Sequence, residues 1–120
     1  MKKILIVEDD NSVAELVRLF LEQNGYEVLV ERNGLNILEV ARKIHPDLIL
    51  LDAVLPEMDG RTVQKMLYND SETESIPIIM MTAYSQLEQA FADKENVAGF
   101  IVKPFNNDEL RRKVRDAVKG

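Results

Sequence analysis

The chain has 120 residues, which is enough for one domain with a hydrophobic core and too few for two. Its net charge of −6 argues against a general affinity for nucleic acids or anionic membranes, and it has no stretch of about 20 apolar residues that could span a bilayer. The absence of cysteine and the single histidine, His45, exclude disulfides, thiolate catalysis and histidine-rich zinc sites, and this composition fits the reducing cytoplasm.

The first expected elements are a strand and an amphipathic helix. Residues 4–7 are apolar without alternation, which indicates a strand buried on both faces, and no export signal precedes them. Helical spacing follows at Val13, Leu16, Val17, Phe20 and Leu21. The pattern Ser12-x-x-Glu15 predicts a capping box at the start of this helix, and Asn24-Gly25 predicts its end.

The same alternation continues through the chain. Further strand-like runs occupy residues 28–30, 48–51, 76–81 and 100–102. Helical periods are formed by Ile37, Val40, Ala41 and Ile44, by Val63, Met66 and Leu67, by Leu87, Ala90 and Phe91, and by Leu110, Val114, Ala117 and Val118. Five strands alternating with five helices predict a doubly wound α/β fold, with a parallel sheet of order 2-1-3-4-5 and helices on both faces.

Polar residues are expected to collect at the carboxyl ends of these strands, where such sheets bind ligands. Glu8 and Asp9 follow the first strand, Asp52 the third and Thr82 the fourth, and Lys103 follows the fifth. Carboxylates from adjoining strands repel one another, and Mg²⁺ with oxygen ligands would relieve that repulsion. With a hydroxyl and an ammonium group nearby, such a site is suited to receive a phosphoryl group on a carboxylate.

Four segments stand in order at the expected strand ends: ILIVEDD, PDLILLDAVLPEMDG, IPIIMMTA and VKPF. Together they resemble the receiver domain of two-component response regulators, the CheY-like family. The resemblance covers the chain from Lys3 to about Val118 and implies that residues 1–120 form one receiver domain. It implies a cytoplasmic phosphorelay switch in which Asp52 is phosphorylated by a sensor histidine kinase or a histidine phosphotransfer protein. Such a protein is regulatory and catalyses only its own phosphorylation and dephosphorylation.

The resemblance also assigns roles to individual residues. The implied Mg²⁺ ligands are Glu8, Asp9, Asp52 and the backbone carbonyl of Val54. Thr82 would move to bond the phosphoryl oxygen, Lys103 would contact the phosphoryl group, and the Lys103–Pro104 peptide bond would be cis. Phe100 would be an aromatic switch whose position follows that of Thr82. The face formed by the fourth helix, the fifth strand and the fifth helix would then change and control a partner protein, an output domain or a homodimer.

Some positions depart from the commonest family pattern. Glu8 stands in place of an aspartate, and we expect it to reach the metal through a bound water. Asn96 precedes the last strand where glycine is common, and we expect it to adopt the left-handed conformation. The stretch from Thr82 to Lys103 is slightly short, so its helix is the element that the sequence defines least. Asp10 is expected to face solvent or to help start the first helix, outside the metal site.

Two large side chains follow the expected site residues. Val54 stands two residues after Asp52, and Tyr84 stands two residues after Thr82. We expect both to shield the phosphoryl group from water and to slow self-dephosphorylation.

Three other functions are compatible with parts of this pattern. A flavodoxin-like cofactor binder needs a loop rich in Gly, Ser or Thr after the first strand, whereas this chain has Glu8-Asp9-Asp10. An aspartate-nucleophile phosphatase needs a second aspartate two residues after the nucleophile as its acid and base, whereas this chain has Val54 two residues after Asp52. The third is a degenerate receiver that acts constitutively as an interaction module. Only a phosphorylation test distinguishes it from a switch. The sequence does not decide between a stand-alone receiver and part of a longer regulator, nor does it identify the kinase.

Overall fold

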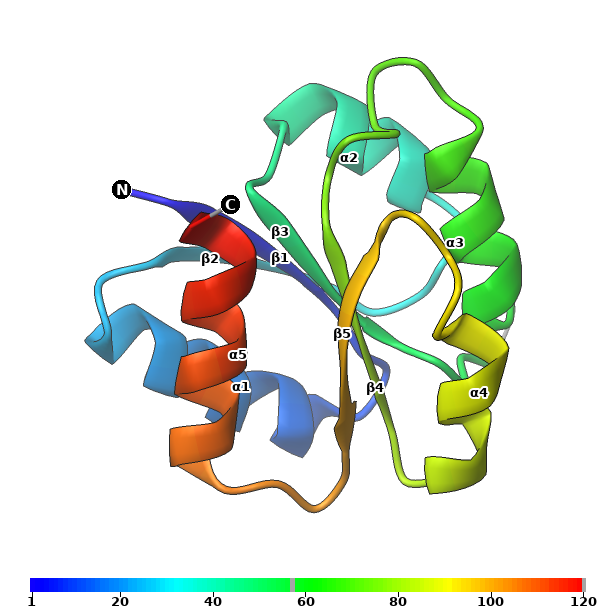
Figure 1. Cartoon of the computed structure of the whole chain (residues 1–120). Helices are drawn as coiled ribbons and strands as arrows, with labels where there is room; N and C mark the ends of the chain where they lie inside the picture. Colours follow the sequence, from blue (N-terminus) through cyan, green and yellow to red (C-terminus); the bar gives the residue numbers. More distant parts are fainter. Residues whose placement is uncertain (57, 120) are drawn as a thin grey trace.

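Five apolar runs form one parallel sheet with the strand order β2-β1-β3-β4-β5. The computed structural model describes residues 1–56 and 58–119 (Figure 1). The strands are β1 (Lys3–Val7), β2 (Glu27–Glu31), β3 (Leu48–Asp52), β4 (Ile78–Thr82) and β5 (Val97–Val102). This order confirms the predicted doubly wound fold, with its change of direction between β1 and β3.

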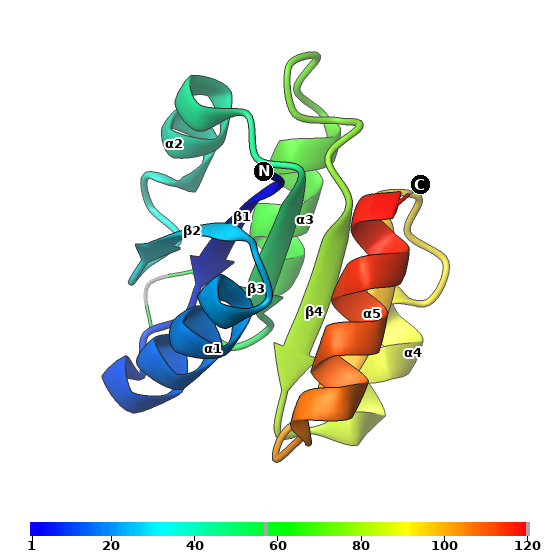
Figure 2. The ribbon, with the colours of Figure 1, turned by 90° about the vertical axis from the view of Figure 1, so that its left-hand side faces the viewer.

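Helices cover both faces of the sheet. They are α1 (Asn11–Gln23), α2 (Ile37–Ile44), α3 (Gly60–Tyr68), α4 (Glu88–Phe91) and α5 (Asn107–Lys119), and a 3₁₀ turn, η1 (Ser85–Leu87), leads into α4. Helices α1 and α5 lie on one face and α2, α3 and α4 on the other (Figures 1 and 2). Among the described residues, no helix has the length and apolar character needed to span a bilayer.

Each face of the sheet has its own apolar core. Ile4 and Ile6 of β1 pack with residues of α1 and α5, whereas Leu5 and Val7 pack with residues of α2 and α3. Successive side chains of a strand point to opposite faces, so a strand covered on both sides must be apolar at every position. All five residues of β3 and of β4 are buried for this reason. The rigid central strands therefore fix the positions of the residues at their carboxyl ends.

Helix α1 begins earlier than the sequence pattern predicts. Its N-cap is Asp10, whose carboxylate accepts hydrogen bonds from the N–H groups of Ser12 (2.9 Å) and Val13 (3.2 Å). The prediction of a capping box at Ser12 was therefore wrong, because the N-cap lies two residues earlier and Ser12 stands inside the first turn, where its own N–H is bonded by Asp10. Glu15 pairs with Arg18 at 2.6 Å within the helix. The expectation that Asp10 helps to start the helix is confirmed.

The predicted strand boundaries need small corrections. Strand β4 begins at Ile78 and not at Ile76, because Pro77 lacks the N–H group that a central strand requires. Strand β5 begins at Val97, three residues before the predicted run. The fourth helix, which the sequence defines least, contains only four residues after its 3₁₀ turn.

Asn96 does not adopt the expected left-handed conformation. Apart from glycines, His45 is the only described residue with a positive φ, 49°. The Asn96 side chain is buried and bonds α3 instead: its Oδ1 accepts from Nε2 of Gln64 at 2.8 Å, and its Nδ2 donates to the Gln64 carbonyl at 3.2 Å. Asn96 thus joins the start of β5 to α3, a role that depends on contacts distant in sequence.

Candidate functional site

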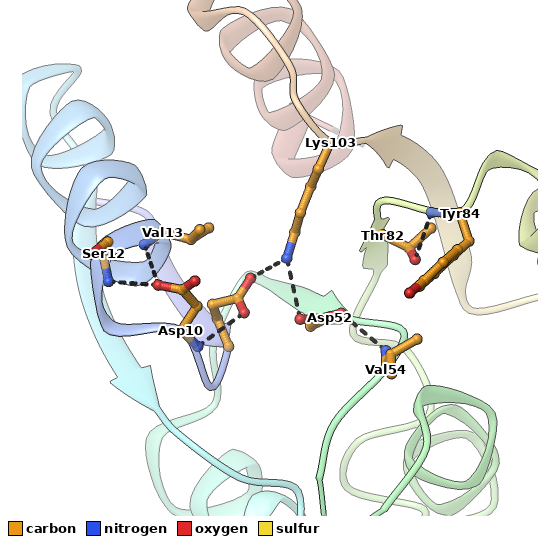
Figure 3. Close-up of polar contacts among 9 residues, drawn as sticks. Asp10, Ser12, Val13, Asp52, Val54, Thr82, Tyr84 and Lys103 are labelled. Atoms are coloured by element: carbon orange, nitrogen blue, oxygen red, sulfur yellow. Dashed lines mark hydrogen bonds and ion pairs between the residues drawn. The ribbon is translucent and has the colours of Figure 1, made fainter.

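Four strand ends bring polar side chains to one edge of the sheet. Glu8 follows β1, Asp52 ends β3, Thr82 ends β4 and Lys103 follows β5. Figure 3 shows Lys103 reaching from the end of β5 toward Asp52, with Thr82 on the neighbouring strand. Glu8, Asp52 and Thr82 are 1%, 5% and 1% exposed. The edge predicted from the sequence therefore holds a buried polar cluster.

Lys103 bridges the two buried carboxylates. Its Nζ lies 2.6 Å from Oε1 of Glu8 and 3.2 Å from Oδ2 of Asp52. The shorter pair has the length of a strong charge-assisted hydrogen bond. The contact with Glu8 was not foreseen, because the sequence places Glu8 and Lys103 95 residues apart and gives no spacing rule that connects them. One ammonium group thus compensates two carboxylates, so the cluster keeps an excess of negative charge.

The electrostatics of the cluster follow from this imbalance. Burial raises the pKa of the Glu8 carboxyl because the carboxylate loses its hydration; the ion pair with Lys103 opposes the rise, and Asp52 adds to it. Burial alone would lower the pKa of Lys103, but the hydrogen bond to Glu8 and the charge of Asp52 outweigh it, so this pKa is raised. Lys103 therefore holds its proton firmly, while Glu8 remains incompletely compensated.

Asp9 adds a third carboxylate to the cluster. One oxygen each from Glu8, Asp9 and Asp52 lies within 4.8 Å of the other two. Asp9 itself is exposed, so the group opens to solvent on its side. Three carboxylate oxygens without nitrogen or sulfur donors match the preference of a hard divalent cation such as Mg²⁺. A cation at this place would supply the positive charge that the buried carboxylates lack.

The loops after β3 and β4 are each tied to a residue of the site. The Val54 N–H donates to Oδ1 of Asp52 at 3.0 Å, and the Tyr84 N–H donates to Oγ1 of Thr82 at 3.1 Å (Figure 3). The two oxygens of Asp52 thus have different partners, Lys103 on Oδ2 and Val54 on Oδ1. Val54 and Tyr84 are themselves about half exposed, 49% and 53%. Both residues therefore adjoin site residues and also face solvent.

Phe100 is a buried residue of β5, the strand next to the one that Thr82 ends. Its ring packs against that of Phe91 on α4, and its carbonyl accepts a hydrogen bond from Nζ of Lys113 on α5. The sequence marked Phe91 only as one member of a helical period and gave no signal for Lys113. The peptide bond between Lys103 and Pro104 is cis, which is the configuration that the family resemblance implies.

A groove adjoins the site between α1 and the start of α5. Its volume is about 700 Å³, and its lining includes Leu16, Phe20, Ala83, Lys103 and Phe105. Leu16 is 69% exposed. Because Ala83 follows Thr82 and Lys103 belongs to the cluster, this apolar groove is continuous with the polar site.

Known proteins share both the sequence and the fold of this chain. Residues 4–115 match the family model of the response regulator receiver domain. The DNA-binding dual master transcriptional regulator RpaA of Synechocystis sp. is 37% identical over 116 residues, which are 96% of this chain and 48% of RpaA. The polar-differentiation response regulator DivK of Brucella ovis is 45% identical over 84 residues, which are 70% of this chain and 68% of DivK.

A solved structure gives the same result. The response regulator protein TrrA of Thermotoga maritima, crystallised in complex with Mg²⁺ and BeF, superposes with a TM-score of 0.87 at 32% identity, covering 98% of this chain and 99% of that one. The chain spans about half the length of RpaA. The matched segment contains the four strand ends and their polar cluster. The chain therefore belongs to the response regulator receiver domain family.

Proposed function

We propose that this chain is a phosphorylation-activated signalling switch in which Asp52 accepts a phosphoryl group in a Mg²⁺-dependent reaction. The observation that carries the proposal is the carboxylate cluster of Glu8, Asp9 and Asp52, two of whose members, Glu8 and Asp52, pair with the ammonium group of Lys103. Burying carboxylates beside one lysine costs desolvation that well-packed apolar residues would avoid, so the cluster is better explained by chemistry than by stability. Membership in the receiver family supports the same assignment.

The donor set fits a resident Mg²⁺. The residues that would hold it are Glu8, Asp9, Asp52 and the backbone carbonyl of Val54. The Val54 amide already bonds Asp52, which keeps this stretch of backbone beside the cluster. When bound, Mg²⁺ offsets negative charge on the incoming phosphoryl oxygens. The complex of TrrA with Mg²⁺ and BeF supports this choice of ion.

The chain's own residues then carry out the transfer. An Asp52 carboxylate oxygen forms the new bond to phosphorus while the bond between phosphorus and the donor imidazole nitrogen breaks; its electron pair stays on that nitrogen, which is protonated by solvent. Lys103 is 3.2 Å from Asp52 and can turn from Glu8 to the phosphoryl oxygens, where it offsets their charge. Thr82 moves to donate its hydroxyl proton to a phosphoryl oxygen; its Oγ1 at present accepts from the Tyr84 N–H, which leaves the hydroxyl proton available.

The switch follows from the movement of Thr82. Phe100 lies on the adjacent strand, so a displaced Thr82 changes the space that the Phe100 ring can fill. Phosphorylation biases an equilibrium between two arrangements of the face formed by α4, β5 and α5. Val54 and Tyr84 stand half exposed beside Asp52 and Thr82, where their side chains limit the approach of water to the acyl phosphate.

The proposed phosphoryl donor is a sensor histidine kinase or a histidine phosphotransfer protein. A donor must reach Asp52 from the open edge of the sheet, and the groove between α1 and α5 adjoins that edge. Its apolar lining and the exposed Leu16 suit an apolar helical surface that carries the donor histidine. Downstream, the face of α4, β5 and α5 acts on a partner protein, on an output domain or on a second copy of the chain. RpaA supports an output domain, because it extends well beyond the segment that matches this chain.

Phosphorylation with a small donor tests the proposal. The protein is incubated with acetyl phosphate and Mg²⁺, and the intact mass is measured with and without a chelator. We expect one Mg²⁺-dependent phosphoryl adduct, lost in Asp52→Asn. Asp59→Asn is the matched control, since asparagine is an equally good N-cap for α3 and this residue lies outside the cluster. An adduct that persists in Asp52→Asn, or none in the unaltered protein, would refute the proposal.

A further inference from the structure

Phe91 anchors the segment that contains α4. Of the described residues from Ala83 to Glu95, Phe91 alone is buried, with 2% of its surface exposed. Leu87 and Ala90 are only partly buried against the same core. A helix of four residues cannot hold its place through its own hydrogen bonds. The position of α4 beside β5, visible in Figure 1, therefore depends on the side chain of Phe91.

Phe91 contacts the residue that is proposed to respond to phosphorylation. Its ring centroid is 6.3 Å from that of Phe100 with the planes tilted by 36°, a geometry of attractive aromatic pairs. Phe100 stands opposite Met80, and Thr82 stands opposite Val102 in the same pair of strands. Thr82 and Phe100 are consequently diagonal neighbours on one face of the sheet. Thr82, Phe100 and Phe91 therefore lie in this order from the edge that holds the polar cluster toward α4, and the two rings are in contact.

The surroundings of Phe100 favour movement of its ring over movement of its backbone. Lys113 of α5 donates to the Phe100 carbonyl and so holds β5 at this point. A surface hollow of about 230 Å³ is lined by Phe91 and Phe100 together with the small residues Ala98 and Gly99. Because this hollow adjoins the two residues, the surface there leaves room for them to shift without moving the strand.

We infer that Phe91 is the positioning residue that couples Phe100 to α4: the two rings move together, and α4 moves with them. This inference rests on the proposed function, because it needs a phosphoryl group at Asp52 to start the movement. It goes beyond that function by assigning the output step to one aromatic contact. It also predicts that α4 responds only while residue 91 carries a ring.

Hydrogen exchange tests the coupling. Backbone amides of residues 85–91 are followed by hydrogen–deuterium exchange with and without Mg²⁺ and beryllofluoride, a phosphoryl mimic. We expect the unaltered protein to show a clear change in these amides. In Phe91→Leu, which keeps an apolar anchor but removes the ring, the change should be smaller by at least about fivefold. Adduct formation on Asp52 from acetyl phosphate should persist in this variant.

Two further variants separate coupling from simple anchoring. Leu87→Ala loosens the same segment without altering the pair of rings, so it should raise basal exchange and keep the response to beryllofluoride. Phe91→Tyr retains the ring and should also keep the response. A normal response in Phe91→Leu, or an equal loss in Leu87→Ala, would overturn the inference. If the unaltered protein forms an adduct but its α4 amides do not respond, the inference fails alone; if no adduct forms, the proposed function fails.

Discussion

Replacing Gly60 by alanine should damage both stability and phosphorylation. A Cβ at this position would lie 2.7 Å from Cα of Ala53, 2.9 Å from the Ala53 carbonyl oxygen and 2.9 Å from Cε of Met80. The first contact is roughly 0.8 Å shorter than the resting distance of two carbon atoms. Because its partner is backbone, the loop after β3 must shift. We expect a loss of about 2–3 kcal/mol in the free energy of unfolding, measured by urea denaturation.

The same shift should reach the site. Ala53 precedes Val54, whose amide holds Oδ1 of Asp52 at 3.0 Å. A displaced loop misplaces that carboxylate, so the rate of adduct formation from acetyl phosphate should fall roughly tenfold or more. The reasoning would be refuted by a Gly60→Ala protein that unfolds and reacts like the unaltered one.

Two other glycines serve as matched controls for Gly60. At Gly99 an added Cβ meets only Cγ1 of Ile79, at an ordinary 3.6 Å, so Gly99→Ala should change the free energy of unfolding by less than about 0.5 kcal/mol. At Gly25 nothing lies within 4 Å, but the φ of 91° is strained for alanine, so Gly25→Ala should cost about 1 kcal/mol without affecting the site. Equal losses in all three variants would contradict the steric argument.

Four further predictions concern caps, shielding and the metal. Asp10→Ala should lower the free energy of unfolding, measured by urea denaturation, by about 1 kcal/mol, and Ser12→Ala by less than half of that. Equal losses would contradict Asp10 as the N-cap of α1. The hydrogen bond from the Thr62 N–H lowers the pKa of Asp59, so the ionised Asp59 stabilises the folded protein at neutral pH, and this stabilisation is lost as the pH falls through the lowered pKa. Asp59→Ala should therefore unfold with about 1 kcal/mol less free energy than the unaltered protein at neutral pH and with nearly the same free energy in acid; a difference that does not change with pH would contradict this. Replacing Val54 and Tyr84 together by serine should shorten the lifetime of the adduct, and an unchanged half-life would remove their shielding role. Mg²⁺ at 100 times its dissociation constant should stabilise the protein by about 2.7 kcal/mol in thermal unfolding, an effect that a chelator reverses and that Asp9→Asn weakens; stabilisation of both proteins to the same extent would place the ion elsewhere.

The fold could be predicted because its signals are local. Unbroken apolar runs mark strands buried on both faces, and the helical periods between them leave one parallel arrangement. Two of the errors arose where another residue determined the local structure. Asp10 holds the N-cap position that was expected for Ser12, and Asn96 bonds Gln64 and does not adopt the left-handed conformation.

The candidate site could be predicted in composition but not in pairing. The strand order places Glu8, Asp52, Thr82 and Lys103 at one edge, yet it does not say which acid the lysine prefers. That choice depends on side-chain reach in the folded chain, where the lysine lies closer to Glu8 than to Asp52. The contact of Phe91 with Phe100 and that of Lys113 with β5 likewise depend on packing between elements.

The most direct test of the account is a crystal structure of the protein with Mg²⁺ and beryllofluoride. The account predicts the ion among Glu8, Asp9 and Asp52, the beryllium on an Asp52 oxygen, and Lys103 turned from Glu8 to a fluorine atom. A structure in which Asp52 carries no beryllium and Lys103 still bonds Glu8, although both reagents are present at saturating concentration, would contradict it.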